Sequence, residues 1–202
     1  FCGGLFADRL AKKDKIKLTM KIVSFRGDYF KLKDHCKFKV KNLVYPVPNP
    51  AFPFLGIHLT RMTNGDIECG PNAVFTFKRE GYKKTDFNLK DTLNDLCFTG
   101  TMKLFINNWK FGLKEYQRAF SKSLFLNELN KMLPSLGIND IEKARSGVRA
   151  IALEQSGQIV DDFKIINKRN NIHVLSAPSP AATACLAIGE NIMHEAIKHC
   201  KI

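Results

Sequence analysis

Hydrophobic and polar positions alternate along the first third of the chain. From Ile16 to Phe77 the segment "IKLTMKIVSFRGDYFKLK" and its successors are rich in β-branched and aromatic residues at period two, which predicts strands. The stretch "NLVYPVPNPAFPF" interrupts them, and its four prolines exclude a helix there. A hairpin follows, with "TNGD" (Thr63–Asp66) at its turn, and the Asn-Gly pair favours a type I′ connection.

The pattern then changes to the helical period. Leucines recur at helical spacing between residues 89 and 136, and the expected N-cap of this stretch is Asn88 or, before it, Thr85. Pro134 and Gly137 end this helical stretch. At Ile141 the strand pattern returns.

The end of the chain repeats a strand-to-helix transition. The strand-like "IHVL" leads into "SAPSPAATACLAIGE", where Ser179 is the expected N-cap and Pro180 the first helical residue. No charge appears from Ala181 to Gly189, which predicts a buried helix start. The opening residues predict the end of a strand, a turn at Gly3 and Gly4, and a short helix.

Sheet, helices, sheet and a last helix together predict an α+β (mixed α/β) chain with an interrupted domain. Residues 1–14 and 145–202 are expected to form one unit, and residues 15–144 an inserted antiparallel sheet with helices.

Composition sets the class. With 202 residues, 45% of them hydrophobic, the chain can bury a substantial core, and no apolar run is long enough for a transmembrane helix. The chain has no initiator Met, which suggests part of a larger protein. Its six cysteines follow no repeated spacing, which favours reduced thiols in the cytoplasm and predicts no metal site.

The formal net charge is +13, and the excess is mostly lysine in three clusters, the longest at Lys31–Lys41. A lysine-rich solvent-facing surface explains this balance most simply. Attraction to an anionic membrane surface is the second interpretation of this positive charge. Specific nucleic-acid binding is not favoured, because the clusters lack interleaved aromatic residues.

Several long motifs resemble one family. "FRGDYF", "VYPVPNPAFPFLGIHLTR", "GDIECGPNAV", "KREGYKKTDF", "SGVRAIALEQSGQIVDDF" and "HVLSAPSPAATACLAIGE" occur in the order found in the L-2-hydroxyglutarate oxidase/dehydrogenase family. These are FAD-dependent enzymes of the D-amino-acid-oxidase-like superfamily. The likeness covers nearly the whole chain, but the GxGxxG segment that cradles the FAD pyrophosphate is absent from these 202 residues.

The resemblance implies the C-terminal half of a flavoenzyme. Residues 15–144 would be the substrate domain, and residues 1–14 and 145–202 would belong to the FAD-binding domain. The parent enzyme would oxidise a small 2-hydroxy dicarboxylic acid, L-2-hydroxyglutarate first, by hydride transfer to FAD. This fragment alone would hold FAD weakly and be inactive without its N-terminal FAD-binding half.

Electrons would pass on to oxygen or to a membrane quinone. The protein would then be cytoplasmic, with peripheral contact at the inner face of a membrane. Two alternatives stay open: a non-catalytic remnant or interaction module, and a basic protein that binds membrane or nucleic-acid surfaces.

The same resemblance assigns the cofactor-facing residues. The start of the last helix would face the flavin pyrimidine edge, where its N–H groups and dipole stabilise negative charge. The expected contacts are Gly3, Gly4, Ser176, Ser179, Ala181, Ala182 and Thr183. A buried helix packed on a sheet, with alanines chosen for packing alone, is the alternative.

Two residues are the catalytic candidates. Arg149 matches the family's carboxylate-clamping arginine, whose planar fork meets both carboxylate oxygens. The alternative is a structural pair with Asp161 or Asp162. His58 in "GIHLTR" would accept the 2-hydroxyl proton, the alternative being a sheet histidine with a local hydrogen bond.

The distal carboxylate of a five-carbon diacid needs a second cation. Arg26 and Arg61 are the candidates, and either could equally be a surface residue. Tyr45 is expected to line the substrate cavity together with Ser176 and Ser179.

Overall fold

The computed structural model describes residues 2–47, 56–177 and 181–200, which form two compact units. Unit 1 comprises Phe1–Val23, Leu93–Leu104 and Ala150–Ile202. Unit 2 comprises Ser24–Thr92 and Phe105–Arg149.

The order of elements follows the predicted sequence of strands, helices and strands. Along the chain they are η1 (Gly4–Phe6), α1 (Ala7–Lys13), β1 (Met20–Leu32), η2 (Asp34–Lys39), β2 (His58–Arg61), β3 (Ile67–Gly70), β4 (Val74–Phe75), α2 (Leu89–Leu96), α3 (Thr99–Phe120), α4 (Lys122–Leu129), β5 (Ile141–Glu154), β6 (Lys164–Lys168), β7 (Asn171–Ser176) and α5 (Cys185–Cys200). The mixed α+β class predicted from the sequence is confirmed.

The sheet of unit 2 is organised around β1. Its strand order is β2-β3-β1-β4, and β5 also pairs with β1. The pairs of β1 with β3 and with β4 are antiparallel, and Phe30 faces Cys69 while Phe25 faces Phe75. Although hydrophobic and polar residues alternate along β1, nearly every residue from Met20 to Leu32 is buried. Both faces of this strand are therefore covered.

The predicted hairpin is confirmed, but its predicted type I′ turn is wrong. The amide of Met62 donates to Asp66 O at 2.8 Å, and the amide of Gly65 donates to Met62 O at 2.9 Å. Within the loop only Gly65 has a positive φ, +84°, whereas a type I′ turn also needs one at Asn64. The Asn64 side chain instead accepts from the Asp66 amide, which stabilises a three-residue loop with glycine in the left-handed position.

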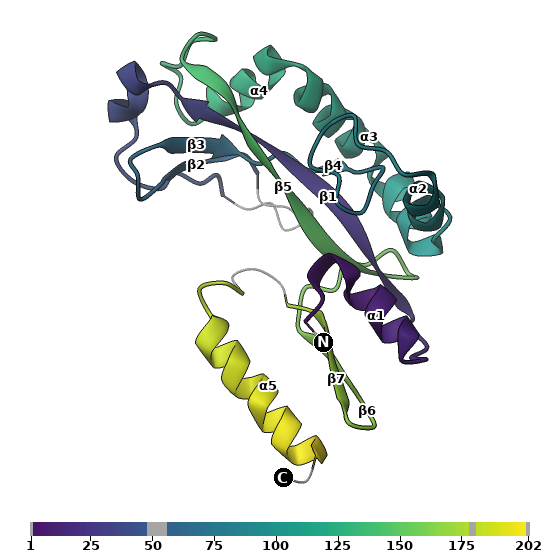
Figure 1. Ribbon diagram of the computed structural model, residues 1–202. Coiled ribbons are helices and arrows are strands. Elements are labelled where there is room, and N and C mark those ends of the chain that lie inside the picture. The colour runs from purple at the N-terminus through teal and green to yellow at the C-terminus, as the bar shows by residue number, and fades with distance from the viewer. Residues whose placement is uncertain (1, 48–55, 178–180, 201–202) are drawn as a thin grey trace. The chain divides into compact units, whose positions relative to one another are not determined.

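Helices cover the sheet of unit 2 (Figure 1). Asn88 is the N-cap of α2, since its side chain accepts from the Asp91 amide at 2.9 Å. Ser121 caps α4 in the same way. The main core lies between α4 and the β1–β3–β2 face, and the Phe30 and Phe125 rings are 4.6 Å apart within it.

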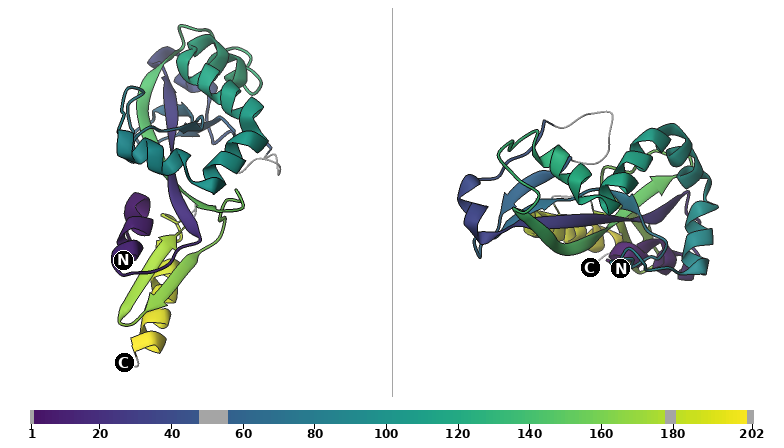
Figure 2. Two further views of the ribbon diagram at one scale, coloured as in Figure 1. Left: turned by 90° about the vertical axis from the view of Figure 1, so that its right-hand side faces the viewer. Right: turned by 90° about the horizontal axis from the view of Figure 1, so that it is seen from above.

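Unit 1 is built from the two ends of the chain. The β6–β7 hairpin lies between α1 and α5 (Figure 2), and β7 contacts α1. Small residues of α1 pack with the first residues of β1 and the last of β5 in a second core, which contains Ala7, Ala11, Met20, Ile22, Ala152 and Leu175. Glu195 accepts a hydrogen bond from Asn167, which ties α5 to β6.

Four local predictions are wrong. Residues Asp34–Lys39 form a 3₁₀ helix within the predicted strand zone, and Cys2 does not lie in a strand. The last helix begins at Cys185, because Ala181–Ala184 form turns. Its start is also exposed, with Leu186 88% accessible, whereas the uncharged sequence predicts burial.

The two units can be set beside the predicted domains of residues 1–14 with 145–202 and of residues 15–144. Unit 1 includes both ends of the chain together with Leu93–Leu104 from the helical stretch. The assignment of these units to cofactor and substrate binding stays a prediction.

The core of unit 2 makes a direct prediction for stability. Phe125 is fully buried against Phe30, so Phe125→Ala should leave a cavity and lower the free energy of unfolding by about 3–5 kcal/mol. Phe38, 72% exposed on η2, is the matched control, and Phe38→Ala should cost no more than about 0.5 kcal/mol. Urea denaturation followed by circular dichroism measures both. Equal losses for the two variants would contradict this placement of the core.

Candidate functional site

Unit 2 brings Tyr45 and His58 together through a short backbone pairing. Val44 and Leu59 exchange two hydrogen bonds of 2.9 Å, amide to carbonyl in each direction. Leu59 is fully buried, so its neighbour His58 points to the other face of β2. There the imidazole stacks on the Tyr45 ring, with ring centroids 4.4 Å apart and an interplanar angle of 21°.

The hydrogen bonds of His58 define which nitrogen is free to act. Nδ1 lies 3.0 Å from the carbonyl oxygen of Gly56, and a carbonyl only accepts, so Nδ1 carries the hydrogen. The neutral ring therefore presents Nε2 with its lone pair. A local hydrogen bond does exist, as the alternative to a catalytic role expects, yet it engages only one of the two nitrogens.

The surroundings of His58 favour its neutral form. Partial burial lowers the pKa of the imidazole below its usual value of 6.5, the Gly56 carbonyl acts in the opposite direction, and the positive charge of Arg149 lowers the pKa further. A histidine that stays neutral near pH 7 can accept a proton, which suits a general base.

Arg149 is the third candidate in this neighbourhood, since it is close enough to act on His58 electrostatically. It is half-buried near the end of the part of β5 that belongs to unit 2. Within the described part of unit 2, no carboxylate forms an ion pair with it. Its guanidinium therefore keeps its donors for an anionic ligand.

The two candidates for the distal carboxylate are engaged within the protein. Arg26 is buried, with Nε 2.8 Å from Asp28 Oδ1 and Nη1 donating to Lys83 O. Asp28 also accepts from the Ser146 hydroxyl, so this group links β1 with β5. Arg61 donates from Nη2 to Lys37 O and Val40 O, and it lies on the face of β2 opposite to His58.

The predicted cofactor-facing residues of unit 1 lie at three places. Gly3 precedes η1, where a Cβ would come within 2.6 Å of Leu10 Cδ1, and Gly4 begins that helix. Ser176 ends β7. Ala181, Ala182 and Thr183 form the turn before α5, and Ser179 lies outside the described residues.

This turn has properties that suit an electron-rich group. The first turn of α5 contains no acidic residue, so nothing there opposes the positive end of its dipole. The side chains of Ala181 and Ala182 are small enough for a planar ring to approach the backbone. These residues are therefore compatible with the role predicted for them.

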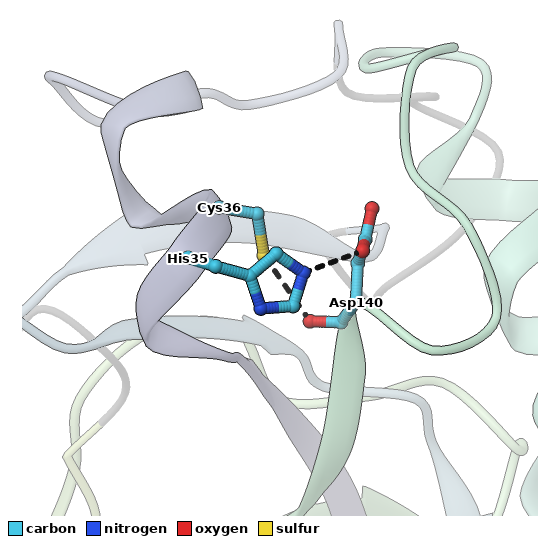
Figure 3. A group of neighbouring side chains, drawn as sticks. All are labelled: His35, Cys36 and Asp140. Carbon is cyan, nitrogen blue, oxygen red and sulfur yellow. Dashed lines mark hydrogen bonds and ion pairs between the residues drawn. The ribbon is translucent and has the colours of Figure 1, made fainter.

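One further group of potential metal ligands lies at the beginning of β5 (Figure 3). The side chains of His35, Cys36 and Asp140 each offer one ligand atom, and these atoms lie within 4.8 Å of one another. Asp140 Oδ1 lies 2.9 Å from His35 Nε2, and Asp140 Oδ2 lies 3.3 Å from Lys39 Nζ. The Cys36 thiol donates to the carbonyls of Lys33 and Asp140.

These contacts explain the cluster as a structural link between η2 and the beginning of β5. The Gly137 amide, His35 and Lys39 together lower the pKa of Asp140 to about 2, with the backbone amide first. Burial raises the pKa of the Cys36 thiol, which keeps its proton on sulfur. The ammonium of Lys39, 3.3 Å from Asp140 Oδ2, already supplies a positive charge to this carboxylate.

Sequence reasoning did not identify Gly56 as part of the site. Its carbonyl sets the tautomer of His58, which makes it a positioning residue. The short spacing in "GIH" carries no signal for this contact, because any backbone carbonyl near the ring could play the same part.

Comparison with known proteins places this chain in a class. The model of the FAD dependent oxidoreductase family matches residues 1–194, so the chain belongs to that family. These are FAD-dependent enzymes, as the resemblance in the sequence predicted. None of the described helices combines the length and the apolar character needed to cross a membrane.

Its curated relatives are more specific. The chain is 46% identical over 198 residues to an L-2-hydroxyglutarate dehydrogenase of Indibacter alkaliphilus, covering 98% of this chain and 50% of the relative. It is 43% identical to the Escherichia coli K12 protein of that name, covering 95% and 46% respectively. The mitochondrial L-2-hydroxyglutarate dehydrogenase of Nematostella vectensis is 44% identical, with 96% and 44% covered. The chain thus spans about half the length of the curated relatives that it matches.

The electrostatics of His58 predict a measurable titration. In the 202-residue chain, the NMR signal of the His58 C2 proton should titrate with a pKa below the usual 6.5. Arg149→Met removes a neighbouring positive charge, so it should raise that pKa. Arg145→Met, also on β5 but exposed and paired with Glu68, is the matched control and should leave it unchanged. An unshifted pKa in Arg149→Met would show that the two side chains do not interact.

Proposed function

We propose that this chain is part of an FAD-dependent enzyme that oxidises L-2-hydroxyglutarate, or a closely similar 2-hydroxy dicarboxylic acid, to the 2-oxo acid. The observation that carries the proposal is a histidine in unit 2 whose Nδ1 is fixed by the Gly56 carbonyl and whose pKa is lowered by burial and by the charge of Arg149. Membership of the FAD-dependent family and the names of the relatives supply the class of reaction and of substrate.

In this proposal Arg149 holds the C1 carboxylate. Its fork can donate two parallel hydrogen bonds, which fixes both the position and the rotation of the carboxylate. The hydroxyl on C2 is then the adjacent group, and its proton goes to His58 Nε2. Nδ1 stays bonded to the Gly56 carbonyl throughout, which holds the ring in place as it becomes positively charged.

The bonds broken and formed in this reaction balance. The O–H and C2–H bonds of the substrate break, and a C=O bond forms at C2. Bound FAD supplies the acceptor for the hydride that leaves C2. The N–H groups at Ala181, Ala182 and Thr183 and the dipole of α5 are assigned to the negative charge that this transfer creates. Ser176, Ser179, Gly3 and Gly4 keep their proposed cofactor contacts.

The rest of the substrate site is less constrained. Tyr45 forms one wall through its stack on His58. Arg26 and Arg61 are the proposed candidates for the distal carboxylate. A substrate at Arg26 would compete with Asp28. Arg61 is the weaker candidate, because it lies on the face of β2 opposite to His58 and already donates to two backbone carbonyls.

The proposal extends to the electron acceptor and the location. We assign the electrons to oxygen or a membrane quinone, in a cytoplasmic protein with peripheral contact at the inner face of a membrane. The net charge of +13 supports attraction to anionic lipid. A non-catalytic remnant of the same fold is the second candidate.

A hybrid enzyme tests this function. The 202-residue chain would be joined to the half of the Indibacter alkaliphilus relative that lies outside the match. The chain alone should show no tightly bound flavin in its absorption spectrum. The hybrid should show a flavin spectrum and form 2-oxoglutarate from L-2-hydroxyglutarate.

Variants of the hybrid separate the roles. His58→Ala should lower kcat by about 10²–10⁴-fold with flavin retained, and Arg149→Met should lower kcat/KM by about 10²-fold, mainly through KM. His194→Ala, an exposed histidine of α5, is the control for loss of an imidazole. A flavin-loaded hybrid without turnover would favour the non-catalytic remnant, and full activity in His58→Ala would refute the assigned base.

A further inference from the structure

The part of α3 that belongs to unit 2 exposes large apolar side chains on one side. Trp109, Leu113 and Phe120 are between 52% and 70% accessible. All three follow Asn108, where the backbone of α3 is non-helical, and at 100° per residue their positions fall within about 40° of one another around the helix axis, so they form one stripe. We call these three residues the α3 stripe.

Other side chains of α3 anchor this helix to β4 and its flanking residues. The Phe105 ring contacts Phe75 edge-on, with ring centroids 5.2 Å apart, and the Tyr116 hydroxyl donates to Phe75 O at 2.9 Å. Glu115, almost fully buried, accepts from the Ala73 amide. These contacts hold α3 against β4 and its flanking residues, while the side chains of the α3 stripe stay exposed.

Lysines accompany the α3 stripe. Lys110 and Lys114 are exposed beside it, and Lys110 Nζ lies 5.7 Å from the centroid of the Trp109 ring. Lys84 comes from the loop before α2 and lies 5.2 Å above the Phe120 ring. These distances are typical of cation–π contacts, so each aromatic end of the stripe carries an ammonium group.

The one carboxylate in α3 is that of Glu115, which is buried and paired with Arg118, so the exposed side of this helix carries no acidic side chain. An apolar stripe that contains tryptophan and is flanked by lysines is the pattern of helices lying in a bilayer interface. The lysine stems can extend along apolar surface while their charges reach the headgroups.

We propose that the α3 stripe, with Lys84, Lys110 and Lys114, docks this protein on the surface of an anionic lipid bilayer. A protein partner fits less well, because the buried centres of protein interfaces are depleted in lysine. The inference rests on the membrane contact in the proposed function and gives that contact a location. It does not depend on the oxidation chemistry, and its test needs neither substrate nor flavin.

Trp109 provides the probe, because it is the one tryptophan of the sequence. Vesicles of phosphatidylglycerol and phosphatidylcholine in equal parts would be added to the full 202-residue chain. Trp109 emission should shift to shorter wavelength, and bromine-labelled acyl chains should quench it, because the indole enters the interface. Vesicles of phosphatidylcholine alone should produce a much weaker response, since the lysines then lack their counter-charge.

Variants locate the contact. Leu113→Ser should lower the partition coefficient about tenfold through lost apolar burial. Lys110→Gln with Lys114→Gln should lower it about 25-fold at low salt, taking about fivefold for each lysine. All three side chains are exposed, so folding should be unaffected, and circular dichroism confirms this.

Matched controls test whether the site is specific. Leu186→Ser on α5 removes an even more exposed leucine, and Lys12→Gln with Lys13→Gln removes two exposed lysines of α1. Neither should change vesicle binding. Equal losses in these controls would show unspecific adhesion and overturn the proposal.

Three further outcomes would overturn the proposal, and the first two would each favour another partner. One is a salt-sensitive response to RNA or DNA in place of vesicles. Another is self-association, in which sedimentation shows dimers that Leu113→Ser dissolves. The third is no response of Trp109 to vesicles. In each case the oxidase proposal would stand or fall by the hybrid enzyme alone.

Discussion

Unit 2 depends on the burial of β1. This strand pairs with β3, β4 and β5, so its backbone groups are satisfied on both edges while its side chains are covered on both faces. The polar residues it carries there must be paired. Arg26 and Asp28 neutralise each other, and Ser146 on β5 completes the hydrogen bonding of Asp28. The ion pair between Arg26 and Asp28 is thus part of what allows the central strand to be buried.

β1 positions the candidate site residues indirectly, through the strands that pair with it. β3 pairs with β1, β2 pairs with β3, and the bridge from Leu59 to Val44 then places Tyr45 against His58. Arg149 is on β5, which pairs with β1 directly. Through this one sheet, residues that are distant in sequence come close enough for the charge of Arg149 to act on His58, and a one-residue slip in β2 would turn His58 toward the core.

What could be predicted from the sequence was mainly local. Asn88 is recognisable as a helix cap because its contact with Asp91 spans three residues, and the Asn64-Gly65 pair marks its hairpin by chemistry alone. The exposed start of α5 was mispredicted because an uncharged run indicates burial only if something covers it. The tautomer of His58 and its stack on Tyr45 depend on backbone pairing that no local pattern reports.

The position of Arg149 near His58 has a consequence for the order of events in the proposed reaction. In the free protein the arginine charge lowers the pKa of the imidazole, which keeps it neutral but makes it a weaker base. A carboxylate bound at Arg149 would cancel much of that charge and raise the pKa again. The base would then gain strength only when a substrate carboxylate is in place, so the clamp that orients C2 would also prepare the group that takes its hydroxyl proton. A hydroxy compound without the carboxylate would lose both effects at once.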